Sequence, residues 1–174
     1  MKNKKKKMNT EKVVWLACLL AFAMIISYIE ALIPIPLGIP GAKLGLANVA
    51  IVFCLYQSGP YGALLVNVSR VILCGLLFGN PYSMLYSIVG AAFSFVIMVL
   101  LKRIPSFSMI GVSIAGGVAH NIGQLLLALC ITQVPVLLYY IPFLLMTGAV
   151  TGLLNGGLTR LVYDRVEKIV NKRR

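Results

Sequence analysis

One arginine lies in the middle of an apolar stretch that is long enough to cross a bilayer. Arg70 sits near the centre of residues 61–79, a segment with no other charged residue. A guanidinium near the bilayer midplane costs at least ~2.5–3.5 kcal/mol on insertion scales, and it does not shed its proton to avoid that cost. We therefore expect Arg70 to face a solvated cavity lined by protein, where it binds a polar ligand.

Other polar residues fall at similar depth. Asn67 precedes Arg70 by three residues and shares its helix face. A later apolar segment carries three more polar residues near the midplane on one broad face: His120, Asn121 and Gln124. We predict a polar pocket in which Arg70 holds an anionic group and the neutral side chains supply hydrogen bonds. The alternative is that each neutral group bonds a neighbouring helix, which is worth ~0.6 kcal/mol.

Three residues mark the outer rim of this predicted pocket: Asn48, Glu30 and Lys43. Asn48 lies about one turn in from the outer side, and we assign it to substrate binding with the other two. Lys43 would assist Arg70 with an anion. A mutual ion pair between Glu30 and Lys43 that pins the intervening loop is an equally good interpretation, and Glu30 is also a candidate counter-ion for Arg70.

The sequence offers little for catalysis. It contains four acidic residues and one histidine, and Glu30 is the one acidic residue inside a predicted membrane segment. No pair of carboxylates is available for acid–base chemistry or for binding a magnesium diphosphate. The four cysteines lie singly in different apolar segments, without metal-ligand spacing. We predict no catalytic residues, no metal and no cofactor.

The composition indicates an all-α integral membrane protein. Hydrophobic residues make up 60% of the chain and charged residues 11%, against about 25% charged in soluble domains. Six transmembrane helices are predicted, at residues 13–33, 42–57, 61–79, 82–101, 110–132 and 136–162. The second is short for a bilayer crossing. We place the transmembrane domain at residues 13–165, between basic tails at 1–12 and 166–174.

The net charge of +12 is explained by membrane orientation. Basic residues gather in both tails and in the loop that holds Lys102 and Arg103, which the positive-inside rule places in the cytoplasm. The expected partners are therefore a lipid membrane and a small molecule, with no nucleic acid, and the expected location is the cell membrane. The apolar, proline-rich loop at residues 34–41 would face outward and cap the pocket.

Small residues at four-residue spacing allow close helix contact. Ala17 and Ala21 form such a pair in the first predicted span, and three glycines repeat the spacing in the last: Gly148, Gly152 and Gly156. A fifth-span pair, Ser113 and Gly117, has the same spacing. Each stripe is interpreted either as ordinary packing or as a docking face for another membrane protein.

The segment at residues 35–52 resembles the Gx transporter family, which is often labelled heptaprenyl diphosphate synthase component I. The resemblance rests on the run Gly41-Ala42-Lys43-Leu44-Gly45-Leu46-Ala47-Asn48. That family is similar to the substrate-binding S components of energy-coupling factor transporters. The resemblance implies a six-helix S-component-like bundle, an outer pocket gated by the loop after the first span, and docking of a coupling protein on Ala17 and Ala21.

Two functions remain open from the sequence. The first is substrate capture for an energy-coupled uptake transporter that works with a transmembrane coupling protein and ATPases, for a small metabolite that is anionic or partly apolar. The second is a non-catalytic membrane accessory in polyprenyl or quinone metabolism or in flavin-linked electron transfer. Catalysis of prenyl transfer is the weakest hypothesis, because the carboxylates it requires are missing from the sequence.

Overall fold

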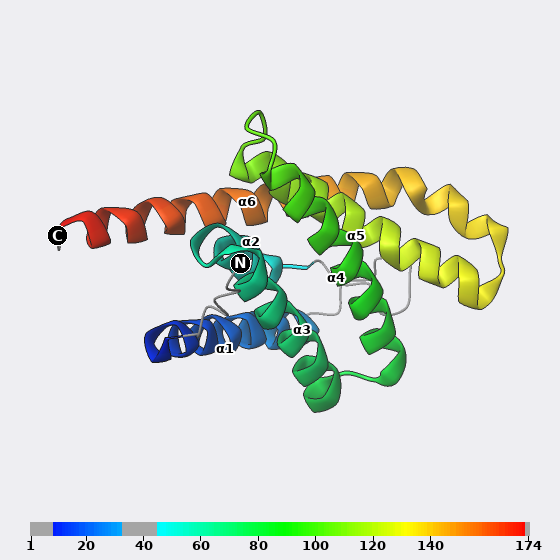
Figure 1. Cartoon of the computed structure of the whole chain (residues 1–174). Helices are drawn as coiled ribbons and strands as arrows, with labels where there is room; N and C mark the ends of the chain where they lie inside the picture. Colours follow the sequence, from blue (N-terminus) through cyan, green and yellow to red (C-terminus); the bar gives the residue numbers. More distant parts are fainter. Residues whose placement is uncertain (1–8, 33–44, 173–174) are drawn as a thin grey trace, which may run out of the picture.

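The chain folds into a bundle of helices, seen in a computed structural model that describes residues 9–32 and 45–172. The elements in order are α1 (Thr10–Leu32), α2 (Asn48–Gln57), α3 (Gly59–Phe78), α4 (Pro81–Lys102), α5 (Met109–Thr132), the 3₁₀ helix η1 (Pro135–Tyr140) and α6 (Ile141–Lys172). No β-strand occurs within these ranges. The start of α1 and the end of α6 lie on the same side of the molecule, at the left of Figure 1.

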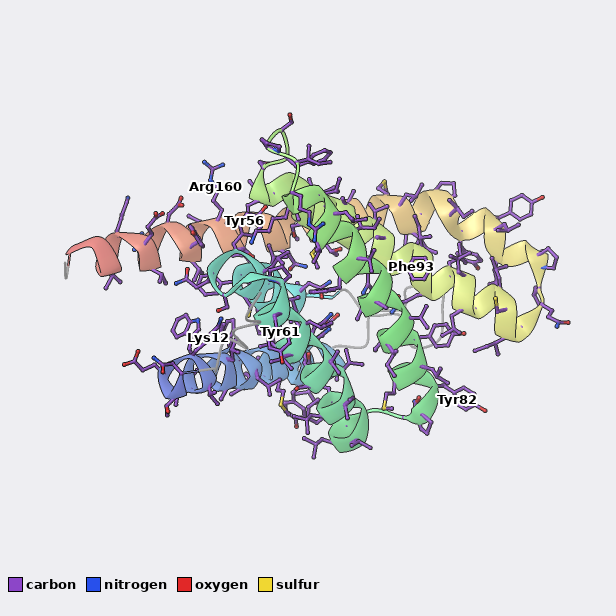
Figure 2. The ribbon with its side chains drawn as sticks, in the orientation of Figure 1. Lys12, Tyr56, Tyr61, Tyr82, Phe93 and Arg160 are labelled. Carbon is purple, nitrogen blue, oxygen red and sulfur yellow. The ribbon has the colours of Figure 1, made fainter. Side chains whose placement is uncertain are left out.

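Within residues 9–32 and 45–172, five helical segments are long and apolar enough to cross a membrane: α1, α3, α4, α5 and the continuous η1–α6 unit. Their outer surfaces carry large exposed apolar side chains, such as Leu76 and Met146. Exposed aromatic residues also project from the bundle, among them Tyr61 and Tyr82 (Figure 2). Charged and polar side chains such as Arg70 and Gln124 are buried instead. An apolar exterior around polar interior groups is the arrangement that lipid requires.

The second predicted span contains a shorter helix than expected. Where residues 42–57 were expected to form a membrane helix, α2 is a ten-residue helix, Asn48–Gln57, which is about 15 Å long. Every residue from Asn48 to Leu55 in α2 is buried. A helix that is apolar on all sides is stable when other helices surround it, so α2 is an internal helix enclosed by its neighbours.

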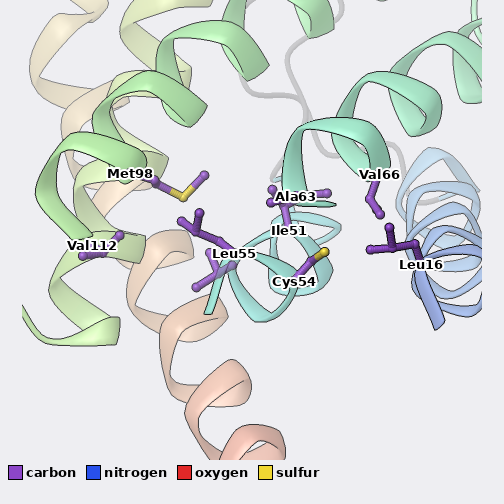
Figure 3. Close-up of a cluster of buried hydrophobic side chains, with 9 residues drawn as sticks. Leu16, Ile51, Cys54, Leu55, Ala63, Val66, Met98 and Val112 are labelled. Atoms are coloured by element: carbon purple, nitrogen blue, oxygen red, sulfur yellow. The ribbon is translucent and has the colours of Figure 1, made fainter. Parts of the chain in front are cut away.

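The core of the bundle is built around α2. Ile51, Cys54 and Leu55 pack with side chains from four other helices: Leu16, Ala63, Val66, Met98 and Val112 (Figure 3). At the end of α2, the Lys102 ammonium donates a hydrogen bond of 2.5 Å to the Leu55 carbonyl. A cation is favoured at a helix C-terminus, so this contact fixes the end of α4 against α2.

The α5–α6 pair is packed through glycines. A Cβ atom added to Gly152 would lie 2.6 Å from the Ile114 Cα, and one added to Gly156 would lie 2.8 Å from the Ile110 Cα. A Cβ on Gly117 would clash with the Gly148 carbonyl. The small-residue stripe of α6 therefore packs against α5 inside the bundle. This is the ordinary packing that was one of the two interpretations of the stripe.

Local signals set the ends of α4 and α5. The Asn80 side chain accepts a 2.7 Å hydrogen bond from the Ser83 N–H, and Pro81 occupies the first helical turn, where it is tolerated. The Ser108 hydroxyl accepts a hydrogen bond from the Gly111 N–H in the same way.

The last helix runs without a break to Lys172. The predicted boundary between the transmembrane domain and the basic C-terminal tail, at residues 165–166, therefore falls inside α6.

Candidate functional site

A small polar cavity lies between α1, α3, α4 and α5, next to the start of α2. Its volume is about 30 Å³. The polar and charged side chains in its lining are Ser27, Glu30, Asn48, Arg70, Ser83, Ser87 and His120. This combination of a cation, a carboxylate and several neutral hydrogen-bonding groups suits a polar ligand better than an apolar one.

Arg70 is the centre of this cavity. Its Nη1 donates to the Ser27 hydroxyl at 3.4 Å, and its Nη2 donates to the Asn67 Oδ1 at 3.1 Å. Both of these partners are neutral. The Nε group is buried and has no hydrogen-bond partner within the described part of the chain. An unused guanidinium N–H beside a cavity is a donor available to an anionic or carbonyl-bearing ligand.

His120 and Gln124 lie one turn apart on α5 and pack against the backbone of α4. Gly90 makes this possible, because a Cβ atom there would be 2.9 Å from His120 Cε1 and 3.0 Å from Gln124 Cγ. The His120 Nδ1 and both amide atoms of Gln124 are buried without hydrogen-bond partners among the described residues. Buried polar groups in proteins are nearly always paired, so these groups mark the place where a hydrogen-bonding ligand is expected.

The backbone of Gly45 closes one side of the cavity. Gly45 has a φ of 76°, a left-handed conformation that strongly favours glycine. Its N–H donates to Glu30 Oε1 at 2.5 Å, and its carbonyl accepts from Asn155 Nδ2 at 3.0 Å. The backbone of Gly45 thus connects α1 to α6. The positive φ explains why a glycine stands immediately before Leu46-Ala47-Asn48.

The structure brings most of the predicted binding residues together and places Asn121 apart from them. Glu30, Asn48, Arg70 and His120 line the cavity. Asn67 is joined to it through its bond to Arg70, whereas Gln124 lies one turn beyond His120 and is not among the residues that line it. Asn121 is different, because its amide donates to the Leu144 carbonyl at 2.8 Å and to the Thr147 hydroxyl at 3.2 Å on α6. Lys43 lies outside the described residues.

The structure places the Asn121 side chain away from the polar cavity. Asn121 follows His120 directly, and consecutive helix residues are about 100° apart, so His120 faces α4 while Asn121 faces α6. Its amide joins two membrane helices, which is the alternative that the sequence left open for every neutral polar residue.

The cavity is also smaller than the predicted chamber. At about 30 Å³ it has space for one or two water molecules, whereas ligand pockets are typically ~300–1,000 Å³. A vitamin-sized molecule fits only if the lining residues move apart. The described part of the chain contains no group of three or more His, Cys, Asp or Glu residues placed to hold a metal.

Several residues of the site were not predicted from the sequence, Ser83 and Ser87 of α4 among them. Ser27 precedes Glu30 by three residues, so helical spacing could have placed both on one face. Gly45 was part of a noted motif, but its positive φ is visible only in the structure. Asn155 lies far away in the sequence, and its bond to Gly45 depends on the position of α6.

The predicted docking pair, Ala17 and Ala21, is exposed on α1. Ala17 also borders a shallow apolar groove with Leu16, Leu65 and Val66. No partner contact tests this pair, so docking there stays a prediction.

Comparison with known proteins gives two matches. The family model described as heptaprenyl diphosphate synthase component I matches residues 19–162. A solved structure titled "Structure and mechanism of the S component of a bacterial ECF transporter" is similar, with a TM-score of 0.73 and 16% sequence identity over 94% of this chain and 99% of that chain. At this identity the likeness establishes a shared fold. No curated protein matches the sequence.

Proposed function

Because the chain belongs to the family described as heptaprenyl diphosphate synthase component I, and has the fold of a transporter S component, we propose that it is a membrane subunit that binds a small substrate. The observation that carries this proposal is the buried Arg70, which donates hydrogen bonds to two neutral partners and whose Nε N–H has no partner among the described residues. The ligand is anionic or carries a strong acceptor. It also contacts His120 and Asn48.

In this proposal the ligand enters from the outer side of the cell membrane. Both tails and the loop with Arg103 face the cytoplasm. Uptake is coupled to ATP hydrolysis by separate chains, a transmembrane coupling protein and ATPases, and the exposed Ala17 and Ala21 are the docking surface. The chain itself performs no bond-making chemistry, since the cavity contains a single carboxylate, Glu30, among its lining residues.

A second candidate function is favoured by the description of the family, which names a component of a prenyl diphosphate synthase. In this case the chain would be a non-catalytic membrane accessory that recruits a soluble synthase or a flavoprotein. Co-purification distinguishes the two functions. Recovery of ATPase subunits supports transport, and recovery of a prenyl synthase or flavoprotein in their place supports the accessory role.

The test of the binding site is the retained small molecule. The protein is purified gently in detergent, and bound metabolites are identified and quantified by mass spectrometry in wild type, Arg70→Ala and Arg103→Ala. We expect Arg70→Ala to lose at least tenfold of the retained ligand, because the buried cation is removed. Arg103→Ala is the matched control, since Arg103 is exposed in the α4–α5 loop, and it should retain the ligand.

Folding is checked separately by the thermal midpoint and by gel filtration of each variant. A folded Arg70→Ala protein that retains as much ligand as wild type would show that Arg70 is structural, and the proposed site would be wrong.

A further inference from the structure

An apolar groove of about 360 Å³ lies between α3 and α4. Its walls come from the outer surfaces of the two helices, mainly Leu64, Val68, Ile72, Ile88, Ala92 and Val96. Several of these side chains are half exposed, including Val68 at 49% and Val96 at 54%. Because both helices are membrane spans, the groove opens toward lipid.

A turn at residues 79–80 joins the two helices (Figure 1). There, a Cβ atom on Gly75 would lie 2.6 Å from the sulfur of Met84. The groove is formed farther from the turn, by Leu64–Ile72 on one side and Ile88–Val96 on the other. The groove, at about 360 Å³, is within the size range of ligand pockets. The polar cavity, at about 30 Å³, is below that range.

The groove and the polar cavity are neighbours. Val71 lines both of them. Asn67 lines the groove, and its Oδ1 accepts the hydrogen bond from Arg70 Nη2. The apolar groove and the cavity that holds the buried cation thus share the Val71 side chain, and Asn67 links the groove to Arg70.

We infer that the ligand is an amphiphile with a single apolar chain, whose anionic head binds at Arg70 and whose chain lies in the α3–α4 groove. This inference rests on the proposed function and specifies its substrate class. The charge of Arg70 selects the head, and the lipid-facing walls accept only an apolar chain. The head reaches Arg70 from the outer side, as in the proposed function, and the chain passes Val71 into the groove when the lining residues separate.

The experiment compares matched variants in nanodiscs of phosphatidylcholine, where the partition of the probe into lipid is the same for every protein. The probes are dodecyl phosphate, inorganic phosphate and dodecanol. Val68→Phe fills the groove. Val150→Phe is the control, because Val150 is 52% exposed on α6, which does not line the groove.

We expect saturable binding of dodecyl phosphate to the full chain. Val68→Phe should weaken it at least fivefold and Arg70→Ala at least tenfold, while Val150→Phe stays within twofold of wild type. Thermal midpoints confirm that each variant is folded. Dodecanol should bind at least tenfold more weakly than dodecyl phosphate, because it lacks the charge.

The outcomes separate the binding site from the class of its ligand. If Arg70→Ala abolishes binding of either phosphate probe but Val68→Phe behaves like Val150→Phe, the ligand is not a single-chain amphiphile bound in the groove. The proposed binding site at Arg70 is then still supported. If Arg70→Ala leaves the binding of every probe unchanged, both fail. Absence of saturable dodecyl phosphate binding, or equal binding of phosphatidic acid with the same dependence on Val68, also overturns the single-chain ligand.

Discussion

At the scale of single residues, the site depends on how a permanent charge is accommodated within a membrane helix. Arg70 donates hydrogen bonds to two neutral groups, and its buried Nε N–H has no partner among the described residues. Glu30 lines the same cavity, where its Oε1 accepts the Gly45 N–H. A lysine would not reproduce this arrangement, because the guanidinium presents several donors in a fixed plane. The residue type therefore favours a planar or multidentate acceptor.

Gly90 tests whether His120 takes part in binding. Gly90→Ala introduces a methyl group 2.9 Å from His120 Cε1 and 3.0 Å from His120 Nε2, which forces the imidazole to move. Because a side-chain end can shift, we expect the fold to remain while the retained ligand, measured by mass spectrometry after purification, falls at least fivefold.

The matched control for this substitution is Gly111→Ala, where the added methyl group would meet nothing closer than 3.5 Å. It should retain the ligand. A Gly90→Ala protein with full ligand retention would remove His120 from the site and leave it as a packing residue.

At the scale of the helices, prediction from the sequence succeeded where hydropathy alone decides the structure. The predicted spans at 61–79, 82–101 and 110–132 each agree with α3, α4 and α5 within two residues at either end. The prediction differed at α2, where tertiary contacts decide the structure, and at the two ends of the last span. No local signal in Val49–Leu55 shows that four other helices enclose this segment. The sequence after residue 162 likewise does not fix the end of α6 at Lys172.

The candidate site shows the same division between features that the sequence contains and features that depend on tertiary contacts. Arg70, Glu30, Asn48 and His120 were predicted from charge and depth, which the sequence contains. The direction of Asn121 and the tie from Asn155 to Gly45 depend on which face of α5 or α6 meets which neighbour. A single sequence carries no information on that choice.

The α5–α6 contact yields a prediction about stability. Gly152→Ala places a methyl group 2.6 Å from the Ile114 Cα and 2.7 Å from the Ser113 carbonyl oxygen. These are backbone atoms, so the helices must separate. We expect a loss of about 1–3 kcal/mol in the free energy of unfolding, the usual cost of overpacking, measured by denaturation in mixed micelles.

The control lies five residues later on the same helix. A Cβ atom on Gly157 would have no neighbour within 4 Å, so Gly157→Ala should be neutral or slightly stabilising, since alanine favours the helix by about 1 kcal/mol. Equal effects of the two substitutions would mean that α5 and α6 are not in this contact in the membrane.

At the scale of the whole molecule, the arrangement of the helices separates the polar cavity from the exposed alanine pair of α1. The polar cavity lies between α1, α3, α4 and α5, and the exposed alanine pair lies toward the N-terminal end of α1. The start of α1 and the end of α6 share one side of the molecule (Figure 1), and Lys12 and Arg160 both lie in that half (Figure 2). A ligand captured at one membrane face can thus be coupled to partners at the other face, provided that the basic ends are cytoplasmic.

That orientation is tested by cysteine labelling in intact cells. After Cys18, Cys54, Cys74 and Cys130 are replaced, single cysteines are introduced at Val134, in the α5–η1 connection, and at Ser106, in the α4–α5 loop; both positions are exposed. We expect a membrane-impermeant maleimide to label position 134 in intact cells and position 106 only after permeabilisation, because Lys102 and Arg103 hold that loop inside. The reverse pattern would place the ends of α1 and α6 outside. Arg70 would then open toward the cytoplasm, and export or recruitment of a cytoplasmic enzyme would replace uptake as the function of the site.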